Sequence, residues 1–115
     1  MSAERLAELL GHMAQSGKLA ISYVEGMNKE DFLADTRTQQ AVIMNLVIIG
    51  ETATKILQDH TAFTEAQATI PWRSMKGMRN RIAHGYFDTD LNVVWETVQT
   101  SVPDLVQQLA GIKPA

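Results

Sequence analysis

The sequence predicts an all-α fold, a bundle of four to five helices. Apolar residues recur three and four positions apart through most of the chain, which is the spacing of one buried helix face. No stretch alternates apolar and polar residues as a half-buried strand would. At 115 residues, with 45% hydrophobic and 20% charged residues, the chain is long enough for one packed domain and ordinary in composition for a soluble protein.

The N-terminal half contains two long predicted helices with a short one between them. The first covers about residues 3–25 and ends at Gly26, because glycine readily adopts the left-handed conformation that terminates helices. Asn28 is the predicted N-cap of the short helix. The second long helix covers about residues 35–59, and its centre, residues 41–49, is apolar nearly all round. We expect this helix to be central and packed on several sides, and a second chain could supply one of its neighbours.

The C-terminal half begins with Thr64-Glu-Ala-Gln67, which resembles a capping box that opens a short helix. A proline break follows, and then a predicted helix over about residues 72–83 that carries most of the basic side chains. Asp90 is the predicted N-cap of a final helix over about residues 91–109. We expect Pro103 to kink that helix, because proline removes a backbone donor.

Composition and spacing exclude several classes of site. The chain has no cysteine, so disulfides and thiolate zinc sites are excluded. Its histidines, His12, His60 and His84, are far apart, and no group of histidines and carboxylates has metal-ligand spacing. The longest apolar run, residues 41–49, is too short to span a bilayer, and the N-terminal residues do not resemble a signal peptide. We therefore predict a cytoplasmic protein that needs no metal or cofactor and does not associate with a membrane.

The charges are unevenly distributed. The formal net charge is −3, but no acidic residue lies between Glu65 and Asp88, where Arg73, Lys76, Arg79 and Arg81 fall. This window carries +4, so the remainder carries −7. A basic patch on an acidic body can hold a phosphate backbone, so Arg73, Lys76 and Arg81 are predicted RNA contacts. The alternative is a solvated helix face that is basic without binding anything.

Within the basic window, Arg79, His84 and Tyr86 form an Arg-x4-His-x-Tyr pattern. Cleavage of RNA by its own 2′-hydroxyl needs proton transfer and positive charge on the phosphate. His84 can transfer the protons and Arg79 can supply the charge, without a metal ion. Asn80 could orient the phosphate or the imidazole. Tyr86 could stack on a base or donate to a phosphate.

The spacing of Arg79 and His84 raises a geometrical problem. Five residues correspond to about 140° of helix rotation, so the two side chains do not share a face of one continuous helix. Either the helix ends near Ala83 and Gly85 redirects His84, or the site is shared between two chains across a two-fold axis. The alternative without catalysis is a plain helix end at which His84 interacts favourably with the helix dipole.

Other polar and aromatic residues have simpler predicted roles. Glu51 is expected to pair with Lys55 in the next turn of the same helix. Asn45 is expected to form a buried hydrogen bond to another helix. Trp72 and Trp95 are expected to be core or interface residues rather than ligand contacts.

Six sequence blocks together carry a more specific signal than the motif alone. They are Phe32-Leu-Ala-Asp-x-x-Thr-Gln39, Asn45-Leu-x-x-Ile-Gly-Glu51, Ile70-Pro-Trp-Arg73, Gly77-Met-Arg-Asn80, His84-Gly-Tyr-Phe87 and Val94-Trp-x-x-Val98. Over about residues 5–110, their order and spacing resemble the HepT-like branch of the HEPN-domain proteins. Members of that branch are toxin partners of minimal nucleotidyltransferase antitoxins.

The resemblance implies an all-α homodimer in which residues 1–115 form a single HepT-like HEPN domain. It implies a metal-independent endoribonuclease toxin that cleaves cellular RNA, such as tRNA or mRNA, in a cleft between two chains. By matching positions, Arg79 and His84 would be catalytic, with Asn80 as their polar neighbour. Tyr86 would receive AMP from ATP through a cognate MntA-type nucleotidyltransferase antitoxin. The competing prediction is a non-catalytic dimeric module that docks a nucleotidyltransferase or nucleotides.

Overall fold

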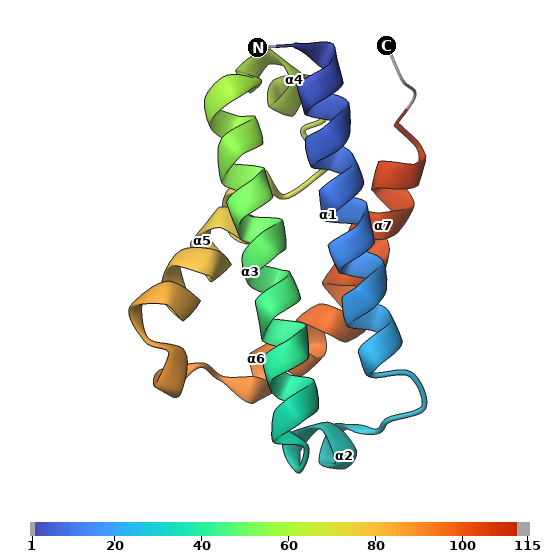
Figure 1. The fold of residues 1–115 in the computed structure, drawn as a ribbon, viewed down its shortest axis with the longest axis vertical. Helices are drawn as coiled ribbons and strands as arrows, with labels where there is room; N and C mark the ends of the chain where they lie inside the picture. The colour runs from blue at the N-terminus through green and yellow to red at the C-terminus, as the bar shows by residue number, and fades with distance from the viewer. Residues whose placement is uncertain (1, 113–115) are drawn as a thin grey trace.

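The computed structural model describes residues 2–112, and every regular element in that range is helical, as the apolar spacing predicts (Figure 1). Met1 and residues 113–115, which the predicted domain includes, lie outside the described range. The elements in chain order are α1 (Ala3–Tyr23), α2 (Lys29–Leu33), α3 (Thr36–Asp59), α4 (Thr61–Ala66), α5 (Trp72–His84), the 3-10 turn η1 (Tyr86–Asp88), α6 (Leu91–Glu96), the π-helical turn η2 (Thr97–Ser101) and α7 (Val102–Ala110).

The central helix of the bundle is α3, as its apolar centre predicts. It packs against α1 on one side and against α5 on the other, and α1 packs in turn against α7 (Figure 1). In its most apolar window α3 is long and apolar enough to cross a membrane, with a mean hydropathy of 1.3, but half of that window is buried inside the bundle. Such burial is typical of the core helix of a soluble protein.

The helix boundaries in the N-terminal half follow the predicted capping residues. Gly26 has a φ of 77°, the left-handed conformation expected after a helix end. Asn28 and Asp31 form a reciprocal capping box at the start of α2, with Asn28 Oδ1 accepting from the Asp31 amide at 2.8 Å. Asp35 caps α3 by accepting from the Thr38 amide at 3.0 Å. These caps confirm the predicted divisions of this half of the chain.

A continuous apolar core joins the helices, and both tryptophans belong to it, as predicted. Trp95 packs on Phe32 with ring centroids 5.4 Å apart, and Trp72 lies edge-on to Phe63 at 6.0 Å. The largest fully buried side chains are Phe32, Met13, Ile56, Val42, Val94 and Val98.

Two local predictions are wrong. Thr64 does not open a helix, because α4 already begins at Thr61 and the Thr64 hydroxyl donates within its own turn, to the Thr61 carbonyl oxygen at 2.7 Å. Asn45 does not bridge two helices. It is buried among apolar residues and donates instead to the Ala41 carbonyl oxygen, four residues back in α3, at 2.9 Å.

The final helix is interrupted next to Pro103, as predicted. The interruption is a widened π-helical turn, Thr97–Ser101, between α6 and α7, with Pro103 in the first turn of α7. A proline lacks the N–H that an unbroken α-helix would use at this point, and a π-helical turn accommodates that loss.

Candidate active site

The position of α5 depends on Gly50, in the middle of α3. A Cβ atom at Gly50 would overlap Arg79 Cβ and lie 2.7 Å from the Met75 carbonyl oxygen. Because glycine has no side chain, the two helices approach closely enough for the backbone of α5 to lie directly over Gly50. This contact fixes the position of the Arg79 backbone relative to α3.

Glu51, the residue after Gly50, holds the Arg79 side chain. Arg79 Nε lies 2.8 Å from Glu51 Oε1, although its N–H does not point at that oxygen, so the contact is an ion pair rather than a hydrogen bond. Arg79 Nη1 also donates to Asn80 Oδ1 at 2.8 Å. The predicted pair of Glu51 with Lys55 is therefore wrong, because α5 carries Arg79 onto α3 at this point.

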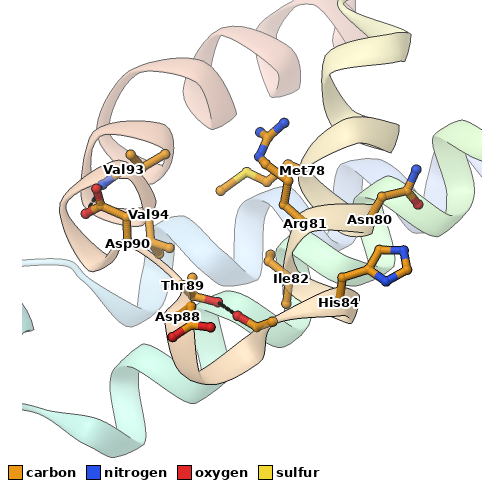
Figure 2. Close-up of a pocket in the computed structure, with 11 residues that line it drawn as sticks. Met78, Asn80, Arg81, Ile82, His84, Asp88, Thr89, Asp90, Val93 and Val94 are labelled. Carbon is orange, nitrogen blue, oxygen red and sulfur yellow. Dashed lines mark hydrogen bonds between the residues drawn. The ribbon is translucent and has the colours of Figure 1, made fainter.

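His84 lies on a different side of α5 from Arg79. The helix ends at His84, one residue after the predicted end near Ala83, and the rotation of about 140° between Arg79 and His84 applies to the folded chain. His84 is exposed, and its side chain points to the same side of α5 as Asn80, four residues earlier (Figure 2). Within one chain, Arg79 therefore faces α3 and His84 faces solvent.

The outward face of α5 is basic. Arg73, Asn80 and His84 follow one another at helical spacing along this face, and exposed Lys76 and Arg81 flank them. The Arg81 guanidinium folds back along the helix, with Nη1 3.4 Å from the position that a Cβ on Gly77 would occupy. The structure thus places all three predicted RNA contacts on the exposed surface of one helix.

A cavity of about 510 Å³ opens between α5 and the start of α6 (Figure 2). Asn80, Arg81 and His84 border it on the α5 side, but Arg79 does not. Its remaining lining residues are Met78, Ile82, Gly85, Asp88, Thr89, Asp90, Val93 and Val94. The Thr89 hydroxyl lies 3.4 Å from the Gly85 carbonyl oxygen and closes the turn below the cavity.

Tyr86 begins η1, immediately after α5. Its side chain is 42% exposed, and its ring packs edge-on against Phe87 with centroids 5.7 Å apart. Phe87 itself is 98% exposed. The phenol of Tyr86 is therefore accessible on the surface, two residues from His84 but outside the lining of the cavity.

Residues 2–112 contain no group of three or more histidine, cysteine or acidic side chains that could hold a metal ion.

The sequence interpretation missed Glu51 as the partner of Arg79, and it missed the cavity. One signal for the first was present: a glycine in the middle of a long apolar helix lowers helix propensity by about 1 kcal/mol and indicates close approach of another backbone. The cavity had no comparable signal, because its walls come from two helices separated by a turn.

The chain is similar to known proteins over most of its length. A family model for HepT-like ribonucleases matches residues 13–112. The protein named "Probable ribonuclease HepT" of Thermococcus cleftensis is 39% identical over 98 residues, which cover 85% of this chain and 86% of the relative. The protein named "Putative RNase TTE0752" of Caldanaerobacter subterraneus is 32% identical over 103 residues, covering 90% of this chain and 89% of the relative.

A protein of Methanocaldococcus jannaschii, named "Putative RNase MJ0127", is 28% identical over 112 residues, covering 97% of this chain and 90% of the relative. No solved structure matches the chain significantly. The family match spans most of the chain and confirms the family indicated by the six sequence blocks. The chain belongs to the HepT-like ribonuclease family.

Proposed function

We propose that the chain is a metal-independent endoribonuclease toxin of the cytoplasm, with Arg79 and His84 as its catalytic residues and Asn80 as their polar neighbour. The observation that carries the proposal is the arrangement on α5. Arg79 is held by Glu51 and Asn80, and His84 stands on an exposed basic face, in a chain of a ribonuclease family. The whole chain, residues 1–115, acts as one domain.

The reaction follows from the groups present. His84 accepts the proton of the ribose 2′-hydroxyl, whose oxygen attacks the adjacent phosphorus. The bond from phosphorus to the 5′-oxygen breaks, and that oxygen takes up a proton from His84. Arg79 stabilises the negative charge that develops on the phosphate oxygens. The products are a 2′,3′-cyclic phosphate and a 5′-hydroxyl, and the requirement for a 2′-hydroxyl restricts the enzyme to RNA.

A homodimer resolves the separation of Arg79 and His84. On α3, Met44 is 59% exposed and Ile48 is 37% exposed, and Glu51 continues the same stripe one turn further along the helix. A second copy packed on this apolar stripe would lie beside the Glu51–Arg79 pair. In a two-fold arrangement, Arg79 of one chain and His84 of the other then face a common cleft.

The RNA backbone lies along the outward face of α5 in this proposal. Arg73 and Lys76 contact its phosphates, Arg81 contacts the RNA at the cavity between α5 and α6, and these contacts weaken with added salt. Since the side chains of Arg73 and Lys76 are exposed and lie outside the lining of that cavity, they supply affinity rather than sequence preference.

Tyr86 is the proposed control point. A cognate MntA-type nucleotidyltransferase antitoxin transfers AMP from ATP to the exposed phenol, forming an O–P bond and releasing pyrophosphate. The adduct is bulky and anionic, so two residues from His84 it blocks the cleft and repels RNA phosphates.

Purified protein incubated with RNA in EDTA tests the catalytic proposal. We expect cleavage that leaves a 2′,3′-cyclic phosphate, and a loss of about 10²-fold or more in His84→Ala and in Arg79→Ala. His12→Ala is the matched control, because His12 is an exposed histidine on α1, and it should cleave like wild type. Equal activity in His84→Ala and wild type would rule out His84 as the residue that transfers the protons. Binding of a nucleotidyltransferase without cleavage would instead favour the non-catalytic docking module.

A further inference from the structure

We propose that the cavity between α5 and α6 is a nucleobase subsite that makes cleavage selective for guanine. The inference rests on the proposed ribonuclease function and adds the feature that selects the substrate. It uses residues of the cavity that have no role in the proposed proton transfer, chiefly Asp88, Arg81 and Val93.

The cavity borders the proposed catalytic residues. Asn80 and His84 lie on its α5 side, with their side chains pointing away from Asp90 and Val93 on the opposite wall (Figure 2). A nucleotide whose phosphate contacts His84 therefore lies at the rim of the cavity. The volume of about 510 Å³ lies within the usual range for pockets that hold small molecules, roughly 300–1,000 Å³.

Part of the cavity wall is apolar. Met78, Ile82 and Val93 present apolar side chains to the cavity. Val93 is 48% exposed, although it stands at the start of a helix whose next two residues are buried. An apolar wall left open to solvent suits the flat face of a base, which gains by leaving water and packing against it.

The cavity is also bordered by the free carboxylate of Asp88. Asp90 is occupied as the N-cap of α6, with Oδ1 accepting from the Asn92 amide at 2.9 Å. The side chain of Asp88 has no hydrogen bond or ion pair to any other residue in the range 2–112. The Arg81 guanidinium likewise has no ion-pair partner within that range. Asp88 thus offers the cavity an uncommitted acceptor, and Arg81 offers it an uncommitted donor group.

These two groups complement guanine better than any other base. An ionised carboxylate only accepts hydrogen bonds, and guanine alone presents two adjacent donors, N1–H and N2–H₂, on its pairing edge. Adenine and cytosine present a donor next to an acceptor, and uracil presents one donor between two acceptors. The O6 and N7 acceptors of guanine are also the pair that an arginine contacts with both of its donors.

The test is the base composition around cleavage sites in a random-sequence RNA pool, read by sequencing the 5′-hydroxyl ends. We expect wild type to show guanine enriched at one fixed position beside the cut. Asp88→Asn should lower that enrichment at least about 5-fold, while total cleavage falls less than about 3-fold. Val93→Trp, which fills the cavity from an exposed position, should have the same effect.

Two variants on α6 control for the loss of a charge and for the added bulk. Glu96→Gln removes an exposed carboxylate of α6, and Asn92→Trp adds the same bulk one residue before Val93; neither residue lines the cavity. Both should keep the wild-type preference. Cleavage without base preference, or a preference that Asp88→Asn and Val93→Trp leave unchanged, would overturn the subsite while leaving the ribonuclease proposal intact.

A binding measurement separates the subsite from catalysis. In a ¹H–¹⁵N NMR titration, 5′-GMP should shift the amide signals of Asp88, Thr89 and Val93, and 5′-UMP at the same concentration should shift them much less. If the protein cleaves no RNA but shows this difference, the subsite stands and the ribonuclease proposal fails. If neither nucleotide shifts these signals and cleavage shows no base preference, the subsite is wrong.

Discussion

At the scale of single residues, the contacts of the Arg79 side chain are the most informative about its role. It is held by a charged partner on α3 and by a neutral amide on its own helix. Arg79 is 24% exposed and Glu51 is 50% exposed, so water screens their attraction, and the pair adds little to the free energy of unfolding. Its effect is to orient the guanidinium, which in the proposed mechanism affects catalysis more than stability.

Glu51→Gln tests this orienting role. The change keeps the shape of the side chain and removes its charge, so the unfolding free energy should fall by less than about 1 kcal/mol. We expect kcat for RNA cleavage to fall about 10-fold or more, with KM little changed, because a misplaced guanidinium stabilises the transition state less. Glu8→Gln, which breaks the exposed Arg5–Glu8 pair on α1, is the control and should not alter kcat. An unchanged kcat in Glu51→Gln would contradict the proposal that Glu51 orients Arg79 for catalysis.

Asp35 provides a pH-dependent prediction. The Thr38 hydroxyl donates to its carboxylate at 2.7 Å, and this bond, with the Thr38 amide and the nearby Arg37 charge, lowers the pKa of Asp35 below its ordinary value. A lowered folded-state pKa means that the carboxylate stabilises the fold above the unfolded-state pKa of about 3.9, and that this contribution is lost as the pH falls through the folded-state pKa.

We therefore expect Asp35→Ala to melt at a lower temperature than wild type at pH 6, and the difference to narrow at pH 3. Thermal unfolding followed by circular dichroism at the two pH values measures this. If the melting temperatures of the variant and wild type differ equally at both pH values, the Asp35 cap stabilises α3 without its charge.

At the scale of helices, the contact of α3 with α5 positions the candidate site. It depends on Gly50, whose missing side chain leaves room for Arg79 Cβ and the Met75 carbonyl oxygen. Any side chain at position 50 would separate the two helices and draw Arg79 away from Glu51. The same small residue thus serves packing and the geometry of the site.

Gly50→Ala tests that contact. We expect a loss of about 1–3 kcal/mol in the free energy of unfolding, because the added methyl meets backbone and Cβ atoms that cannot move independently. Gly11→Ala, in α1, is the matched control: nothing lies within 4 Å of its new Cβ, so it should stabilise the helix by about 0.5–1 kcal/mol. Urea unfolding of both variants measures the two changes. A Gly50→Ala variant as stable as Gly11→Ala would contradict the close approach.

At the scale of the whole molecule, the exposed apolar stripe of α3 is the surface through which we propose that two chains assemble. Met44 and Ile48 are exposed on the helix that otherwise forms the centre of the bundle, and the stripe leads to the Glu51–Arg79 pair. Apolar surface of this kind on an enzyme whose Arg79 and His84 face different directions favours a two-chain site.

In size-exclusion chromatography with light scattering, we therefore expect wild type to run as a dimer and Met44→Lys to run as a monomer. RNA cleavage should fall in parallel, because each chain alone separates Arg79 from His84. Leu19→Lys, which changes a 38% exposed leucine on α1, should leave both assembly and cleavage unchanged. A Met44→Lys monomer with full activity would rule out a shared site.

The helices and their boundaries were largely predictable because they depend on local chemistry. Asn28, Asp35 and Asp90 cap helices with their own side chains, Gly26 takes a conformation that few other residues adopt, and Pro103 lacks a donor wherever the chain goes. Thr64 was mispredicted for a related reason: whether its hydroxyl caps a helix or bonds within one depends on where the preceding helix stops.

The sequence alone determined the all-helical fold, the family, and the presence of Arg79, His84 and Tyr86 in one basic segment, since spacing and residue type carry that information. Only the tertiary structure decided that Glu51 forms its ion pair with Arg79 and not with Lys55. It also decided that a cavity bordered by Asp88 and Val93 lies between α5 and α6. Both depend on how closely separate helices approach, which is set by the packing of Gly50 and the core rather than by any single segment of the chain.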